Sequence, residues 1–331
     1  MPPVTKKCLI GLVKWTLTLL VFFFIGRELV KSSDEFRHYE WNLHYGRLVA
    51  AGLLYLAAFF PASYFWHHVL RSFGQSPTFF RSMKSFYLSQ LGKYVPGKAM
   101  VVVIRSAMVS GRNVRTSVAA TGVFYETLTM MAVGAFLSAL IVLLRYGEHW
   151  HFSLMALAVM SASGIPLVPP VFRRVLHLLR IGKNDPDVRA KLDHLTWKLL
   201  PIGGVLMTFL WVGFGLFLWA TIRGLGIETG PLADHIVLFI AVTAMAMVLG
   251  FAVPISPGGL GVREAILATL LVPYFEQILS FPENSLIHLD AKTLALVVSL
   301  AQRVVSIFAE LAAAGVFLSV SFFEKARSSE K

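Results

Sequence analysis

Charged residues and cysteine are scarce in this sequence, and both shortages exclude whole classes of protein. Asp, Glu, Lys and Arg make up 15% of the 331 residues whereas 56% are hydrophobic, and soluble domains do not have these proportions. Cys8 is the only cysteine, so an intrachain disulfide, a CxxC redox site and a cysteine-rich zinc site are impossible. No GxSxG, HExxH or other catalytic constellation occurs. The sequence therefore indicates neither a soluble domain nor an enzyme.

Long apolar runs are abundant, and they define the class. A helix needs roughly 20 residues to cross the hydrocarbon core of a bilayer, and several runs reach this length. Lys6 and Lys7 precede the first run as in a signal peptide, but no small-residue cleavage site follows, so we expect a retained helix. The runs predict an all-α, polytopic integral membrane bundle whose six full spans cover 8–26, 47–70, 117–144, 152–172, 199–222 and 291–323.

Two other apolar stretches are interrupted by proline and glycine. Pro96-Gly97 divides 79–112, and the segment 254–259 divides 234–274. Proline lacks a backbone donor and glycine lets the chain turn, so each break exposes backbone groups that lipid cannot satisfy. Both stretches are predicted to be re-entrant helical hairpins that enter the membrane from opposite sides. Such hairpins at corresponding positions of two halves indicate an inverted repeat with a binding site near the midplane.

The distribution of basic residues predicts the orientation. The net charge is +12, and about 20 of the 30 Lys and Arg residues, which mark cytoplasmic loops, lie in the first seven residues, the segments 71–115 and 173–198, and the tail. Both termini are therefore expected in the cytoplasm, with the protein in the cell (inner or plasma) membrane. A single transmembrane domain, 1–331, is expected, in which the basic linker 173–198 joins a first half, 1–172, to a second half, 199–331.

An arginine follows each break, in the early turns of the helix that resumes there. Arg105 lies in the helix that begins near Lys98, and Arg263 in the helix that begins near Leu260. A helix N-terminus presents unpaired N–H groups and a partial positive charge, which favour a phosphate or carboxylate, and arginine adds bidentate contacts. Two simpler interpretations stay open. Arg105 could extend its charge to the cytoplasmic interface, and Arg263 could pair with Glu264 or another acidic group.

Three charged residues lie deep inside predicted spans. Arg303 is about 12 residues into the last span, roughly 18 Å from its start at the helical rise, where a charge is costly unless it is paired or hydrated. Glu310 lies two turns further along the same face and Gln302 is adjacent, so this helix carries a polar stripe. Glu126 could be a counter-ion for Arg105 or Arg303, or a proton carrier. A purely structural buried ion pair is the alternative to a binding role.

Other motifs carry weaker signals. Residues 92–98 match the GxxxxGK pattern, but Ala99 replaces the expected Ser or Thr and no strand precedes the loop, so a nucleotide site is not predicted. The histidines within 67–68 and 149–151 have no acidic or thiol partner at ligand spacing, so a metal site is not predicted either. We expect no cofactor, no metal ion and no nucleic-acid partner.

Several of these motifs, together with their order along the chain, resemble those of the lysylphosphatidylglycerol synthase transmembrane (flippase-like) family. The resemblance covers nearly the whole chain and is most specific in residues 257–264, while Thr127 is a departure, since members often have Arg directly after that Glu. Bifunctional members carry an aminoacyl-transferase domain after the membrane part, so a stand-alone member that does not make lysyl-lipid by itself is expected. The resemblance rests on Gln90-Leu91-Gly92-Lys93-Tyr94-Val95-Pro96-Gly97-Lys98 with Arg105, on Phe124-Tyr125-Glu126, on Pro257-Gly258-Gly259-Leu260-Gly261-Val262-Arg263-Glu264, and on Gln302-Arg303.

The resemblance implies translocation of an anionic or modified phospholipid, or of a lipid-linked sugar phosphate, between leaflets. Our leading hypothesis is a translocator whose head-group site lies between the two hairpins, where arginines hold phosphate and two glutamates balance charge. One alternative is a non-transporting membrane partner of a separately encoded glycosyl- or aminoacyl-transferase, and another is a membrane transferase acting on a polyprenyl phosphate. The predicted substrate-binding residues are Arg105, Arg263, Arg303, Glu126, Glu310, Lys98, Gly97, Gly258 and Gly259.

Overall fold

The computed structural model describes residues 42–94, 100–146, 148, 150–178, 196–252, 261–280 and 289–329, and this part of the chain is helical with no strand. Among these residues, five helices are long and apolar enough to cross a membrane: α3, α6, α10, α11 and α13. The prediction of an all-α polytopic membrane bundle is confirmed. The elements are α3 (Tyr45–Ser72), α4 (Phe79–Ser89), the 3₁₀ helix η1 (Gln90–Tyr94), α5 (Met100–Val109), α6 (Thr116–Tyr146), α7 (Trp150–Gly164), the 3₁₀ helix η2 (Ile165–Leu167), α8 (Pro169–Leu178), α10 (Leu199–Gly224), α11 (Leu232–Ala252), α12 (Val262–Ile278) and α13 (Ala291–Ser329).

The chain divides into two compact units. The first unit comprises residues 1–52 and 215–306, and the second comprises residues 53–214 and 307–331. The helices α3, α10 and α13 each contribute residues to both units. Each unit therefore combines segments from the two halves expected from sequence, and the inverted repeat stays a prediction.

Four of the six predicted spans correspond to single continuous helices. Continuous helices cover 47–70, 117–144, 199–222 and 291–323, namely α3, α6, α10 and α13. The predicted first span, 8–26, lies outside the described residues. In each of the four matches an uninterrupted apolar run ends near a glycine, a proline or a polar group, as expected for a helix in lipid.

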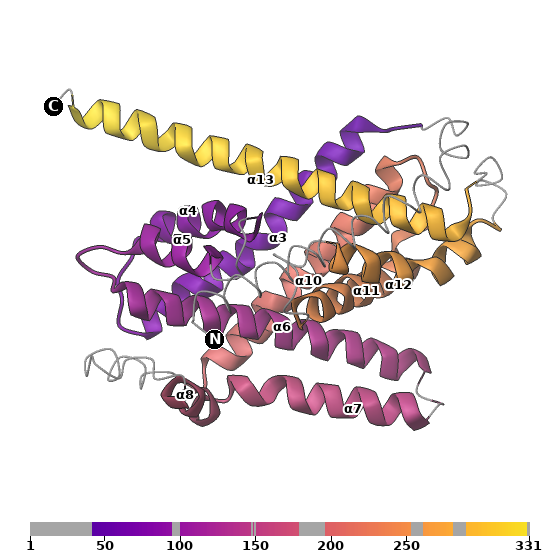
Figure 1. Cartoon of the computed structure of the whole chain (residues 1–331), viewed down its shortest axis with the longest axis horizontal. Helices are drawn as coiled ribbons and strands as arrows, with labels where there is room; N and C mark the ends of the chain where they lie inside the picture. The colour runs from indigo at the N-terminus through magenta and orange to yellow at the C-terminus, as the bar shows by residue number, and fades with distance from the viewer. Residues whose placement is uncertain are drawn as a thin grey trace, which may run out of the picture. The chain divides into compact units, whose positions relative to one another are not determined.

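The predicted span over 152–172 is bent instead of forming one straight helix. Helix α7 ends at Gly164, and the chain continues through η2 into α8 with a bend of 65° (Figure 1). Pro166, Pro169 and Pro170 cluster at the bend, and proline can neither donate the helical hydrogen bond nor accommodate the carbonyl of the preceding turn. The apolar run is long enough for a span, but its prolines divide it into two helices.

In the second unit, α4 and α5 pack against each other as a helical hairpin (Figure 1). Toward its tip, Gly92 approaches α5 so closely that a Cβ atom on it would lie 2.9 Å from the backbone nitrogen of Val101. At its base, the guanidinium of Arg81 donates hydrogen bonds to the carbonyl oxygens of Met108, at 3.2 Å, and Ser110. Because the last carbonyls of a helix lack partners within it, Arg81 both caps α5 and ties the two helices together.

Close packing through glycine also joins the long helices of the second unit. A Cβ atom on Gly213 of α10 would lie 2.6 Å from Cβ of Ala58 on α3. Gly134 of α6 packs against the ring of Trp211, whose Nε1 donates to the carbonyl of Met130 at 3.0 Å. Small residues allow membrane helices to approach closely, so these glycines have the packing role that is ordinary in membrane spans.

In the first unit, α11 and α12 form a second hairpin. A Cβ atom on Gly250, near the end of α11, would lie 3.2 Å from Cβ of Arg263 at the start of α12. At the opposite end, the Tyr274 ring lies 5.4 Å from the ring of His235 and 5.2 Å from that of Phe239. The two helices are therefore antiparallel, and buried apolar side chains of α10, α11, α12 and α13 form the core around them.

Both interrupted stretches thus have the helix–break–helix form predicted for them. The breaks themselves, at 95–99 and 253–260, lie outside the described residues. Helix α11 has 21 residues and is long enough to cross a membrane by itself, whereas the sequence analysis assigns it to a hairpin arm. Re-entry of the hairpins from opposite sides stays a prediction.

Candidate functional site

Arg105 and Glu126 form a buried ion pair in the second unit. Nη1 of Arg105 on α5 lies 2.7 Å from Oε2 of Glu126 on α6, and each side chain is 3% exposed. Arg105 also donates from Nε to the hydroxyl of Ser89 at 2.9 Å, and its guanidinium lies 4.0 Å from the ring centroid of Phe86. The interpretation that Arg105 extends its charge into water is therefore wrong, and Glu126 is its counter-ion. Thr127, which follows Glu126 directly, carries no charge, and Arg105 on another helix supplies the positive charge.

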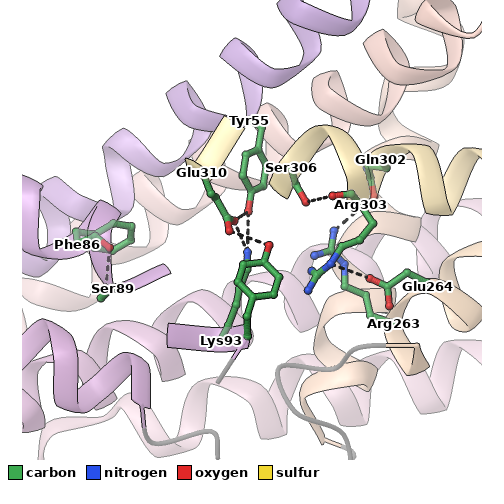
Figure 2. A network of polar contacts seen from close by, with 11 residues as sticks. Tyr55, Phe86, Ser89, Lys93, Arg263, Glu264, Gln302, Arg303, Ser306 and Glu310 are labelled. Carbon is green, nitrogen blue, oxygen red and sulfur yellow. Dashed lines mark hydrogen bonds and ion pairs between the residues drawn. The ribbon is translucent and has the colours of Figure 1, made fainter. Parts of the chain in front are cut away.

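Glu310 is the centre of another buried network in the same unit (Figure 2). Its Oε1 accepts hydrogen bonds from the Lys93 amino group and the Tyr55 hydroxyl, and its Oε2 accepts from the Tyr94 hydroxyl at 2.9 Å. The Lys93 amino group also donates to the Tyr55 hydroxyl at 3.1 Å. The Glu310 side chain is 2% exposed and that of Lys93 15%. Residues of η1 and α3 thus supply three donors to one carboxylate on α13.

Arg263, Glu264, Gln302 and Arg303 form a cluster in the first unit, where α12 begins beside α13. Oε1 of Glu264 lies 3.6 Å from Nε of Arg303, and its Oε2 accepts the N–H of Gly261 at 2.7 Å. Gly261 has φ of +81°, a conformation that favours glycine. One carboxylate therefore caps the first turn of α12 and faces Arg303 on α13 (Figure 2).

Arg263 has a different partner from the one considered in the sequence analysis. Its Nη2 donates to Oε1 of Gln302 at 3.4 Å, whereas Glu264, the neighbouring acid, faces Arg303. Gln302 is 1% exposed, and its Nε2 has no hydrogen-bond partner among the described residues. Arg263 is only partly buried. Within the described part of the chain, the cluster thus has a buried amide donor without a partner next to a partly exposed guanidinium.

Among the predicted site residues that the structure describes, Arg263, Arg303 and Glu310 contact partners that the sequence did not identify. Glu310 and Arg303, two turns apart on one helix, bind different groups: Lys93 for Glu310 and Glu264 for Arg303. Sequence reasoning missed Lys93, Tyr55 and Tyr94. A signal was available, since a lysine within an apolar hairpin needs a buried carboxylate, but neither the nucleotide-loop pattern nor the family resemblance assigns a partner to Lys93. Four predicted residues, Gly97, Lys98, Gly258 and Gly259, lie outside the described residues.

These clusters contain the kinds of donor that bind anions. Guanidinium, ammonium, hydroxyl and amide donors converge on carboxylate oxygens, and the same donors bind phosphate oxygens. In the described part of the chain, no group of three or more His, Cys, Asp or Glu residues could hold a metal ion. His67, one of the histidines considered for metal binding, has its Nδ1 at 3.0 Å from the hydroxyl of Ser82.

The comparison with protein families identifies the class. The family model for the lysylphosphatidylglycerol synthase TM region matches residues 8–281, which is most of the chain, so the protein belongs to this family. No curated protein and no solved structure matches the chain. The family describes a non-catalytic membrane region, and membership gives the protein a role connected with membrane lipids.

Proposed function

We propose that the protein moves an anionic or modified phospholipid, or a lipid-linked sugar phosphate, between the two leaflets of the cell membrane. The observation that carries the proposal is the cluster of Arg263, Gln302 and Arg303 at the start of α12. In this view, the phosphate of the lipid head group binds the donors of the cluster during its passage.

The charges of the cluster support a phosphate ligand. Arg263 and Arg303 contribute two positive charges and Glu264 one negative charge, so the four side chains carry a net positive charge that a phosphodiester would neutralise. The Nε2 donor of Gln302 has no partner among the described residues, and an unsatisfied buried donor is unfavourable. A phosphate oxygen would satisfy this donor and accept from Arg263 at the same time.

The other predicted residues fit this proposal in different ways. The pair of Arg105 with Glu126 has full burial and several partners, which favours a role in holding α5 against α6. Gly97, Lys98, Gly258 and Gly259, in the breaks, are proposed to let a head group approach the backbone. Orientation with both termini in the cytoplasm follows from the Lys and Arg distribution.

The experiment that tests the proposal is lipid exchange in vesicles that contain the purified protein. Head-group-labelled phosphatidylglycerol, lysyl-phosphatidylglycerol and a polyprenyl phosphate are followed separately between leaflets. We expect exchange of at least one, and its loss in Arg263→Gln and Arg303→Gln at unchanged yield of folded protein. Arg223→Gln is the matched control, because Arg223 is an ion-paired arginine of the same unit, bound to Glu228 and 22% exposed.

The outcomes separate the proposal from its alternative. Equal exchange in the arginine variants and the wild type would remove the cluster from the transport route. Absence of exchange for every lipid would contradict translocation and favour a non-transporting partner of a separately encoded glycosyl- or aminoacyl-transferase. In that case a lipid-modifying enzyme is expected to co-purify with the protein.

A further inference from the structure

The donors around Glu310 are of the kinds that bind an oxyanion, and the oxyanion that they bind here is the carboxylate of Glu310 itself. One ammonium and two hydroxyl groups donate to the two oxygens of one carboxylate. Phosphate oxygens accept hydrogen bonds from the same kinds of donor. The carboxylate of Glu310 therefore occupies the position that a ligand oxyanion would take among Lys93, Tyr55 and Tyr94.

Packing indicates which member of the ion pair can be exchanged. The Lys93 nitrogen lies 5.7 Å from the ring centroid of Tyr55 and 5.3 Å from that of Tyr94, so both rings attract its charge independently of the carboxylate. Tyr55 is fixed in turn, since its ring stacks on Phe214 at 5.8 Å. The donors are thus held in place when the anion changes. Lys93 is also the more exposed partner, at 15% against 2% for Glu310, so a ligand can approach it.

A proton is needed for the exchange because Glu310 lies on a long apolar helix and is buried. An ionised carboxylate that loses its partner in such surroundings is strongly disfavoured. Among the described residues, the titratable groups that contact the Glu310 carboxylate are Lys93 and Tyr94 on η1 and Tyr55 on α3. Once a phosphate takes these donors, Glu310 is left without its ammonium, and protonation of its carboxyl group removes the uncompensated charge.

We propose that Glu310 takes up a proton whenever a lipid phosphate replaces its carboxylate at Lys93, Tyr55 and Tyr94, so that one proton crosses with each lipid anion. This inference rests on the proposed function and names its driving ion. The charges balance: a lysine–carboxylate pair becomes a lysine–phosphate pair beside a neutral carboxyl group. The proton enters from the water on the side where lipid binds, and on the other side it leaves as the carboxylate returns to Lys93. The pair of lipid anion and proton moves no net charge.

The test is lipid distribution under a pH gradient. Purified protein is placed in vesicles with labelled phosphatidylglycerol, and valinomycin with equal potassium on both sides holds the membrane potential at zero. One pH unit is a tenfold difference in proton concentration. If one proton crosses with each lipid, this difference sustains about a tenfold excess of lipid in the leaflet that faces the alkaline solution. A pH-sensitive dye inside the vesicles should report proton entry when lipid is added to the outer leaflet alone.

Variants distinguish coupling from simple loss of structure. Glu310→Gln should abolish both the lipid excess and the proton entry, and Tyr94→Phe, which removes one donor, should slow transport but keep the tenfold excess. Glu276→Gln, at an exposed glutamate of α12, is the matched control and should behave as the wild type. The wild-type measurement stands even if Glu310→Gln fails to fold.

Three outcomes would overturn the proposal. Wild-type lipid exchange with an even distribution under the pH gradient would refute proton coupling while leaving translocation intact. A lipid excess that follows a sodium gradient instead of the pH gradient would assign Glu310 to another cation. Absence of any lipid movement, with or without a gradient, would refute the proposed function and the coupling together.

Discussion

Replacement of Glu126 by glutamine is expected to destabilise the protein strongly, because it leaves Arg105 charged and buried. Both side chains of the pair are 3% exposed, and the two charged atoms lie 2.7 Å apart. Removing one partner of such a pair costs about 3–5 kcal/mol, which lowers the folded-to-unfolded ratio by about two to almost four powers of ten. The exposed control Glu276→Gln should cost less than about 1 kcal/mol.

Equilibrium unfolding by SDS in mixed micelles, followed by tryptophan fluorescence, measures this difference. Trp66 is one of the seven tryptophans that contribute to the signal, and its ring lies 5.5 Å from the guanidinium of Arg105. The double variant Arg105→Met with Glu126→Met should recover most of the loss, because replacing both members of a buried pair by apolar groups is close to neutral. A methionine at 105 can still contact the ring of Phe86, and Ser89 keeps its bond to the Phe86 carbonyl at 2.7 Å.

A particular result would refute this reasoning. If Glu126→Gln and Glu276→Gln destabilised the protein equally, the Arg105 charge would not depend on Glu126. If Glu126→Gln left stability unchanged but stopped lipid exchange, the pair would belong to the transport route, as the sequence analysis first suggested. Lipid exchange of the double variant separates the two roles, since a structural pair predicts that the double variant transports.

Two further predictions concern packing and orientation. Gly92→Ala should destabilise the protein by about 1–3 kcal/mol, because the added Cβ would lie 2.9 Å from the backbone nitrogen of Val101. The control Gly204→Ala has no atom within 4 Å of the added Cβ and should be neutral or slightly stabilising. Thermal unfolding in detergent compares the two variants, and equal melting temperatures would contradict the close packing. The second prediction uses a Cys8→Ser background and a membrane-impermeant thiol reagent added to intact cells. The reagent should label Ala233→Cys but not Arg112→Cys, because the basic segment 71–115 is expected in the cytoplasm. The reverse labelling pattern would show that the predicted orientation is wrong.

Most helices could be predicted because each depends on a local property of the sequence. The limits of α3, α6 and α10 lie within a few residues of the predicted spans, since an apolar run must be helical wherever it faces lipid. The division of 152–172 was missed because the prediction weighted the length and apolar character of the run above its prolines. At Pro166 the missing donor outweighs the apolar character of the neighbouring residues.

The candidate sites could be predicted only as a set of residue types. Buried charges in apolar helices require partners, so Arg105, Arg303 and Glu126 were identifiable as important. The pair of Glu126 with Arg105 was one of two alternatives, whereas the pair of Arg303 with Glu264 was not identified, because pairing depends on which helix faces are adjacent. Glu264 illustrates this, since it lies next to Arg263 in sequence but binds Gly261 and faces Arg303.

The position of Glu310 near the end of the chain has a consequence for biogenesis. The hairpins pair neighbouring helices, so they can form while later parts of the chain are still being synthesised. Glu310, however, is separated by 217 residues from Lys93 and by 255 from Tyr55. An insertion intermediate that stops before α13 therefore contains Lys93 without this carboxylate, so the hairpin gains its full stability only when the last helix is in place.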